Sequence, residues 1–109
     1  MERDLQRRIA GNEAVFRNVN EALRAGHWPG EDSSPVAFRC ECAAMGCSQL
    51  VEMSPSEYER VRADPRRFLL AHGHAVPEAE RIVERHRNYI VVEKVEDGAA
   101  VAEDTDPRK

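Results

Sequence analysis

The chain has 109 residues, of which 41% are hydrophobic, 33% charged and only 6% aromatic. These values predict one soluble globular domain with a modest core, and they exclude a chain of several domains. The net charge is −4, and the arginines are interleaved with acids, which argues against nucleic-acid binding. Residues 1–4 lack the plan of a signal peptide, and no stretch could span a bilayer, so we expect a cytoplasmic protein.

Residues 2–25 predict an amphipathic helix that ends near Gly26. The apolar residues that share one helical face are Leu5, Ile9, Phe16, Val19 and Leu23. Asn12 interrupts this face, and Gly11 beside it weakens the turn, so the helix could be two pieces. We expect the apolar face to pack on the protein's own core, and the alternative is a helix that docks on a protein partner.

The middle of the chain predicts two short strands around a cysteine-rich turn. A loop rich in turn residues covers 26–35. Strands are expected over 36–40 and 48–53, as in the frame of a zinc knuckle. A helix follows over 54–64, because Ser54, Pro55 and Glu57 match a capping box with proline at the first helical position.

The second half of the chain predicts further strands. A strand is expected over 67–71, directly before His72-Gly73-His74. Another is expected over 89–95, because these residues are rich in β-branched and aromatic side chains. Residues 78–88 pair with 89–95 as a hairpin in the favoured interpretation, and form a short helix in the alternative. We expect an α+β fold made of an N-terminal helix (1–26), a zinc-binding core with a small antiparallel sheet (27–96) and a disordered acidic tail (97–109).

Three cysteines within eight residues are the strongest signal of chemistry. Cys40, Cys42 and Cys47 are the only cysteines in the chain, and their odd number argues for a metal or for free thiols rather than for disulfides. Side chains alternate along a strand, so Cys40 and Cys42 should share one side while Glu41 points to solvent. Gly46 can take the positive φ of a tight turn that brings Cys47 to the same point.

Three sulfurs need a fourth ligand to complete a structural zinc site, which is tetrahedral. We favour His74, because Gly73 gives the backbone freedom before it and Pro77 suggests a fixed loop after it. His72, His86 and a water molecule are the alternatives. The predicted Zn²⁺ ligands are Cys40, Cys42, Cys47 and His74.

Zinc is preferred to an iron–sulfur cluster, because such clusters use other cysteine spacings. The sequence lacks the His-x-Glu and Pro-Cys-x-x-Cys pieces of zinc deaminases, and it lacks the His-Glu-x-x-His motif. A phosphate-binding glycine loop and a serine elbow are missing as well. We therefore expect a structural metal site in a protein that is not an enzyme.

Residues 16–94 resemble a group of small bacterial proteins of zinc-binding type. The segments that carry the resemblance are 16–21, the cluster of Cys40, Glu41, Cys42 and Cys47, and residues 55–62, 67–68, 73–74 and 89–94. The resemblance implies that the cysteines and His74 belong to one site, and it implies no particular activity. The expected function is a zinc-braced module that binds a protein partner or regulates it, with a thiol-based redox or metal sensor as the alternative.

Overall fold

The computed structural model describes residues 3–26, 34–44 and 46–108, so most of the predicted loop at 26–35 lies outside the described residues. The fold is α+β, as predicted. Its elements are α1 (Arg3–Ala25), β1 (Val36–Arg39), β2 (Leu50–Met53), α2 (Pro55–Arg62), β3 (Arg67–Leu70), β4 (Glu80–Arg85), β5 (Ile90–Lys94) and α3 (Glu96–Asp104).

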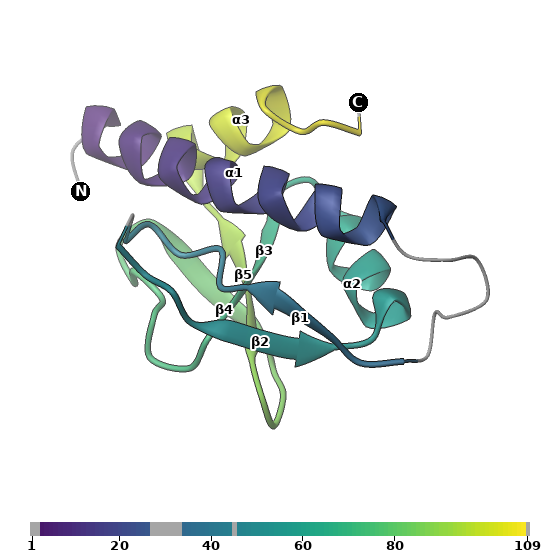
Figure 1. Ribbon diagram of the computed structural model, residues 1–109. Coiled ribbons are helices and arrows are strands. Elements are labelled where there is room, and N and C mark those ends of the chain that lie inside the picture. The colour runs from purple at the N-terminus through teal and green to yellow at the C-terminus, as the bar shows by residue number, and fades with distance from the viewer. Residues whose placement is uncertain (1–2, 27–33, 45, 109) are drawn as a thin grey trace.

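The strands form two antiparallel sheets that share one hydrophobic core. One sheet is the β1–β2 hairpin, and the other has the order β3-β5-β4. The pairing of β4 with β5 confirms the hairpin interpretation of residues 78–95. Figure 1 shows α1 lying across both sheets, with α3 beside it and α2 below its C-terminal end. The core is filled by residues of both sheets and α2, including Phe38, Val51, Tyr58, Phe68, Leu69, Ile90 and Val91.

Helix α2 begins where its capping signals predict. The Ser54 hydroxyl accepts from the backbone N–H of Glu57 at 3.1 Å, and the Glu57 carboxylate accepts from the N–H of Ser54 at 3.1 Å. These reciprocal bonds satisfy two N–H groups that the helix itself leaves free. Glu57 also accepts from the Tyr89 hydroxyl at 2.9 Å, which ties α2 to the residue before β5.

Helix α1 is one continuous helix, and its predicted orientation is wrong. Its buried side chains are mostly polar, and the apolar ones are small except for Phe16: the buried set is Gln6, Ala10, Glu13, Ala14, Phe16, Arg17 and Asn20. By contrast, Leu5, Val19 and Leu23 are exposed. The reason is that each long polar side chain finds a partner below the helix; Arg17, for example, donates to the carbonyls of Pro65 and Ala102.

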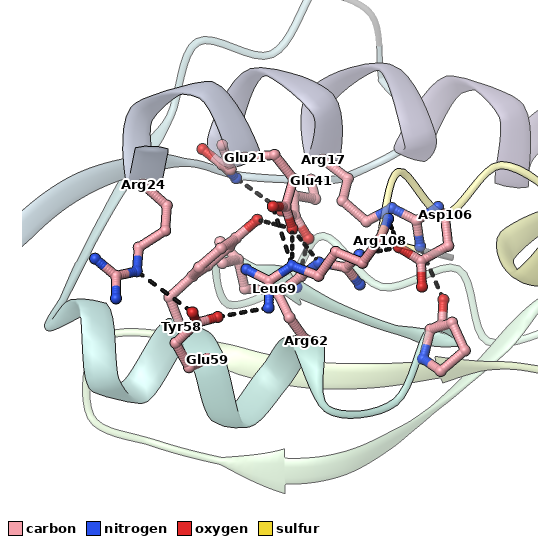
Figure 2. A network of polar contacts seen from close by, with 12 residues as sticks. Arg17, Glu21, Arg24, Glu41, Tyr58, Glu59, Arg62, Leu69, Asp106 and Arg108 are labelled. Atoms are coloured by element: carbon pink, nitrogen blue, oxygen red, sulfur yellow. Dashed lines mark hydrogen bonds and ion pairs between the residues drawn. The ribbon is translucent and has the colours of Figure 1, made fainter. Parts of the chain in front are cut away.

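The predicted disordered tail is also wrong, because residues 96–104 form α3 and pack against α1. The chain after α3 enters a partly buried network of charges drawn in Figure 2. There the fully buried Arg62 side chain bonds to Asp106 and to Glu21, and Arg108 donates to the same Glu21 at 2.9 Å. Asp106 of the C-terminal segment is therefore the partner of a buried arginine, a role that local composition does not reveal.

None of the helices in the described part of the chain combines the length and the apolar character needed to cross a membrane.

Candidate metal centre

The four predicted ligands come together from two loops. Strand β1 leads into Cys40 and Cys42, the return toward β2 carries Cys47, and the loop after β3 brings His74. One potential ligand atom from each residue, a sulfur or an imidazole nitrogen, lies within 4.8 Å of all the others. Cys40 and Cys42 are buried, while Cys47 and His74 are partly exposed, and all three cysteines are free thiols.

A tight turn aims His74 at the sulfurs. The His74 N–H donates to the carbonyl of Ala71 at 3.2 Å, and Gly73 has a φ of +83°. A four-residue turn with positive φ at its third position favours glycine, because a side chain there would clash with the backbone. The turn points His74 Nδ1 toward Cys40 Sγ at 3.4 Å and Cys47 Sγ at 3.7 Å.

These two distances match the spacing of ligands around zinc. With Zn–S bonds of about 2.3 Å and a Zn–N bond of about 2.0–2.1 Å, the edges of a tetrahedral site measure about 3.5–3.8 Å. The donor set of three sulfurs and one imidazole is also one that structural zinc sites use. The residues therefore fit a metal ion without a change in the backbone path of the His74 turn.

Burial favours the neutral thiol form of Cys40 and Cys42 in the absence of a cation. Burial raises the pKa of Cys40 to about 12, although the N–H of Ala71, which donates to Cys40 Sγ at 3.2 Å, acts in the opposite direction. Burial raises the pKa of Cys42 as well. A metal ion bound here would replace the thiol protons and supply the positive charge that stabilises the thiolates.

Glu41 points into the protein, so the prediction that it faces solvent is wrong. The alternation holds, with Cys40 and Cys42 on one side and Glu41 on the other, but the other side is covered by α1 and β3. The Glu41 carboxylate accepts from Asn20 Nδ2 at 2.8 Å and from the backbone N–H of Leu69 at 3.0 Å. Burial raises the pKa of Glu41 to about 7 despite these bonds.

The positive φ predicted for Gly46 is not found. Among the described glycines, only Gly73 has a positive φ. The Cys47 N–H donates to the carbonyl of Ala44 at 2.9 Å. Arg39 adds a bond from its guanidinium to the Cys47 carbonyl at 2.7 Å.

The other candidate histidines lie elsewhere. His72 Nε2 is 2.8 Å from the carbonyl of His86, which anchors the loop of His74 to the β4–β5 turn. His86 stacks on Tyr89 and is 2.6 Å from a carboxylate oxygen of Glu84. Neither belongs to the group of potential ligands.

A cavity of about 270 Å³ opens beside the cluster. It is lined by Cys42, Ala43, Ala44, Gly73, His74 and Val76. Two of the four potential ligands therefore form part of its wall, and its other surfaces are small and apolar. The cavity therefore borders one side of the potential site.

Sequence reasoning missed the residues that hold the cysteine segment in place. Asn20 donates to the carbonyl of Arg39 and to Glu41, and Asn12 donates to the carbonyl of Ala43 at 3.2 Å. A signal was present, because asparagine is a weak helix former and three of them, Asn12, Asn18 and Asn20, interrupt the interior of α1.

No protein-family model, curated protein or solved structure matches this chain.

Proposed function

We propose that the protein is a zinc-binding module in which Cys40, Cys42, Cys47 and His74 hold one Zn²⁺ in a closed structural site. The observation that carries this proposal is the placement of His74 Nδ1 at 3.4 and 3.7 Å from two cysteine sulfurs. Four protein ligands would leave no open position for a reactive water molecule, so the proposed role is structural and not enzymatic. The ion would join the loop after β1 to the loop after β3.

Metal analysis of the purified protein tests this proposal. Inductively coupled plasma mass spectrometry should find about one zinc per chain, and far less in the Cys47→Ser variant, which lacks one ligand. Ser48→Ala, next to Cys47 and exposed, is the matched control and should keep the metal. A wild-type protein that is fully folded and free of metal would overturn the proposal.

The second part of the proposal is that α1 presents the protein-binding surface. Among the described residues, the exposed large hydrophobic side chains are Leu5, Val15, Val19 and Leu23 of α1, and Leu50 of β2. A concentration of exposed apolar side chains on one helix is typical of an interaction site. Arg8 lies on the same side of the helix and forms no ion pair within the described chain. The proposed partner is therefore a protein surface with apolar side chains and a carboxylate opposite Arg8.

A photo-crosslinking amino acid at Ala22, an exposed position beside this surface, tests the contact. A partner captured there should be lost on Val19→Glu and weakened on Arg8→Glu, while Glu52→Lys on β2 leaves it unchanged. Sedimentation of the purified protein separates a second copy of this chain from a different partner. Capture that is insensitive to Val19→Glu contradicts the assignment of α1.

The cavity beside Cys42 and the partial exposure of Cys47 favour a second candidate, a thiol-based redox sensor. In that reaction two thiolates would lose two electrons and form one S–S bond, and hydrogen peroxide would take up the two electrons and two protons from solvent and become two water molecules. The metal would then lose two ligands. Under this candidate, low doses of hydrogen peroxide release zinc and dithiothreitol restores binding; zinc that stays bound under peroxide supports the structural role alone.

A further inference from the structure

Asn20 of α1 is bonded to both neighbours of Cys40. Its Nδ2 donates to the carbonyl of Arg39 at 2.8 Å and to the Glu41 carboxylate at 2.8 Å, and its Oδ1 accepts from the N–H of Arg39 at 2.7 Å. The Asn20 side chain is completely buried. A single residue of α1 therefore fixes the backbone on each side of a potential metal ligand.

Strand β3 also bonds to this segment, on the side opposite the thiols. The Glu41 N–H donates to the Leu69 carbonyl at 2.9 Å, and the Leu69 N–H donates to Glu41 Oε1 at 3.0 Å. Figure 2 shows Glu41 and Leu69 beside the charged network beneath α1. These bonds keep the segment extended, which is the condition for Cys40 and Cys42 to point to the same side.

Helix α1 is also connected, through Arg39, to the segment that carries Cys47. The Arg39 guanidinium lies over the Phe16 ring of α1, 4.8 Å from its centroid, and donates to the carbonyl of Cys47 at 2.7 Å. Asn12 adds its bond to the Ala43 carbonyl. Three side chains of α1 therefore lie against the segment that carries the cysteines, and they contact it both before and after Cys42.

We propose that Asn20 is a positioning residue that couples the metal site to α1, so that metal occupancy controls the packing of the helix and of its outer apolar surface. This inference rests on the proposed zinc site. If the cysteine segment shifts when the metal leaves, the buried amide of Asn20 and the carboxyl of Glu41 lose their partners unless α1 shifts as well. Separating them is costly, so helix and segment move together.

The coupling is reciprocal, because two linked equilibria shift each other by the same factor. Metal binding stabilises the packing of α1, and intact α1 contacts raise the affinity for the metal. The N-terminal part of α1 has other anchors, such as the bond from Gln6 to Glu96 at 3.2 Å and the buried bond between Glu13 and Lys94 at 2.6 Å. The effect should therefore be smallest at these anchors and larger in residues 14–24, which carry Phe16 and Asn20.

Hydrogen exchange of the wild-type protein, with zinc and after chelation, is the direct test. We expect the amides of residues 14–24 to exchange at least about 10-fold faster without zinc, through a local opening of α1 in which the amides of β5 stay protected. If zinc binds and the exchange of α1 is the same in both states, the inference is overturned although the zinc site stands. If zinc does not bind at all, the proposed function itself fails.

The Asn20→Ala variant tests the assignment to one residue. It should weaken zinc binding by about the same 10-fold factor, because the coupling between the metal site and α1 is reciprocal. It should also shift the absorption bands of Co²⁺ bound in place of zinc, and remove the zinc dependence of exchange in α1. Asn18→Ala, an exposed asparagine of the same helix, is the matched control and should change none of these.

An Asn20→Ala protein that stays folded by circular dichroism and keeps wild-type zinc affinity and Co²⁺ bands contradicts the assignment. If that variant does not fold, Asn12→Ala replaces it, since Asn12 is only partly buried and makes one bond to the same segment. Unchanged zinc affinity and unchanged exchange in Asn12→Ala, together with equal wild-type exchange in both states, overturn the coupling.

Discussion

His74 reaches the cysteines because of the turn that precedes it. The positive φ of Gly73 turns the chain after β3, and the adjacent His72 is directed to the carbonyl of His86 instead. Two histidines separated by one residue therefore have different surroundings, although strand alternation would place them on one side. The difference between them gives a sharp test of the ligand set.

Replacing each histidine by alanine should separate the two roles. His74→Ala removes a proposed ligand and should lower zinc affinity by more than about 100-fold, since even the loss of an outer partner costs about 10–100-fold. His72→Ala should leave the affinity within a few-fold of wild type. Competition against a chromophoric chelator measures both, and a larger loss for His72→Ala would reverse the assignment.

Asp106 lies beside two buried arginines and carries a prediction about pH. Burial acts to raise its pKa, but the N–H of Arg108 and the charge and hydrogen bond of Arg62 outweigh it and lower the pKa below its usual 3.8. A carboxyl with a lowered folded-state pKa stabilises the protein above the unfolded-state value, and this contribution is lost as the pH falls through the folded-state value.

Asp106→Asn cannot titrate, so its effect should depend on pH. The variant should be about 1–2 kcal/mol less stable than wild type at pH 7, because Arg62 keeps an acceptor but loses a charged one. The difference should shrink as the pH falls below 3.8, where the carboxyl is protonated first in the unfolded chain and then, at its lowered pKa, in the folded protein. Urea unfolding at several pH values measures this, with Asp104→Asn on the exposed side of α3 as the control. A difference that is constant with pH would refute the explanation.

At the scale of the element, α1 reverses the usual arrangement of an amphipathic helix. Arg17 is completely buried and donates to Pro65, Ala102 and Thr105, whereas Val15 is 47% exposed. Buried polar groups that find partners are tolerated, and an exposed apolar residue costs little by itself. The stability of this helix therefore depends on its polar residues more than on its valines and leucines.

Substitutions on the two faces of α1 should show this reversal. Arg17→Met leaves the buried carbonyl of Ala102 without its donor and should destabilise the protein by about 3 kcal/mol. Val19→Lys, on the exposed face, should change the free energy of unfolding by less than about 0.5 kcal/mol. Chemical denaturation measures both, and a larger loss for Val19→Lys would mean that the outer face is covered in the folded protein.

The elements also show what could be predicted from the sequence. The start of α2 was predictable because Ser54 and Glu57 cap the helix through local contacts, and the β4–β5 hairpin follows from local pattern. The ligand cluster was predictable because three of its four residues are close in the chain. The buried face of α1 and the helix α3 were not, because Arg17 and Asp106 acquire their partners only from distant segments.

At the scale of the whole molecule, the potential metal site contains ligands from both sheets. Cys40 and Cys47 belong to the hairpin of β1 and β2, and His74 to the loop after β3. Aromatic residues are scarce in the chain, at 6%, and a domain of this size buries a smaller fraction of its surface than a large one. A cross-link between the two sheets is therefore expected to contribute a substantial part of the folding free energy.

Zinc should raise the thermal stability of the whole domain, because it binds the folded chain far better than the unfolded one. At free zinc concentrations about 1,000 times the dissociation constant, the gain is about 4 kcal/mol, which corresponds to a rise in Tm of about 15 °C for a domain of this size. Scanning calorimetry with zinc and with a chelator measures the rise. Mg²⁺, which prefers oxygen ligands, should produce none, and Cys47→Ser should lose most of it. An equal Tm with and without zinc would show that the sheets hold together without the metal.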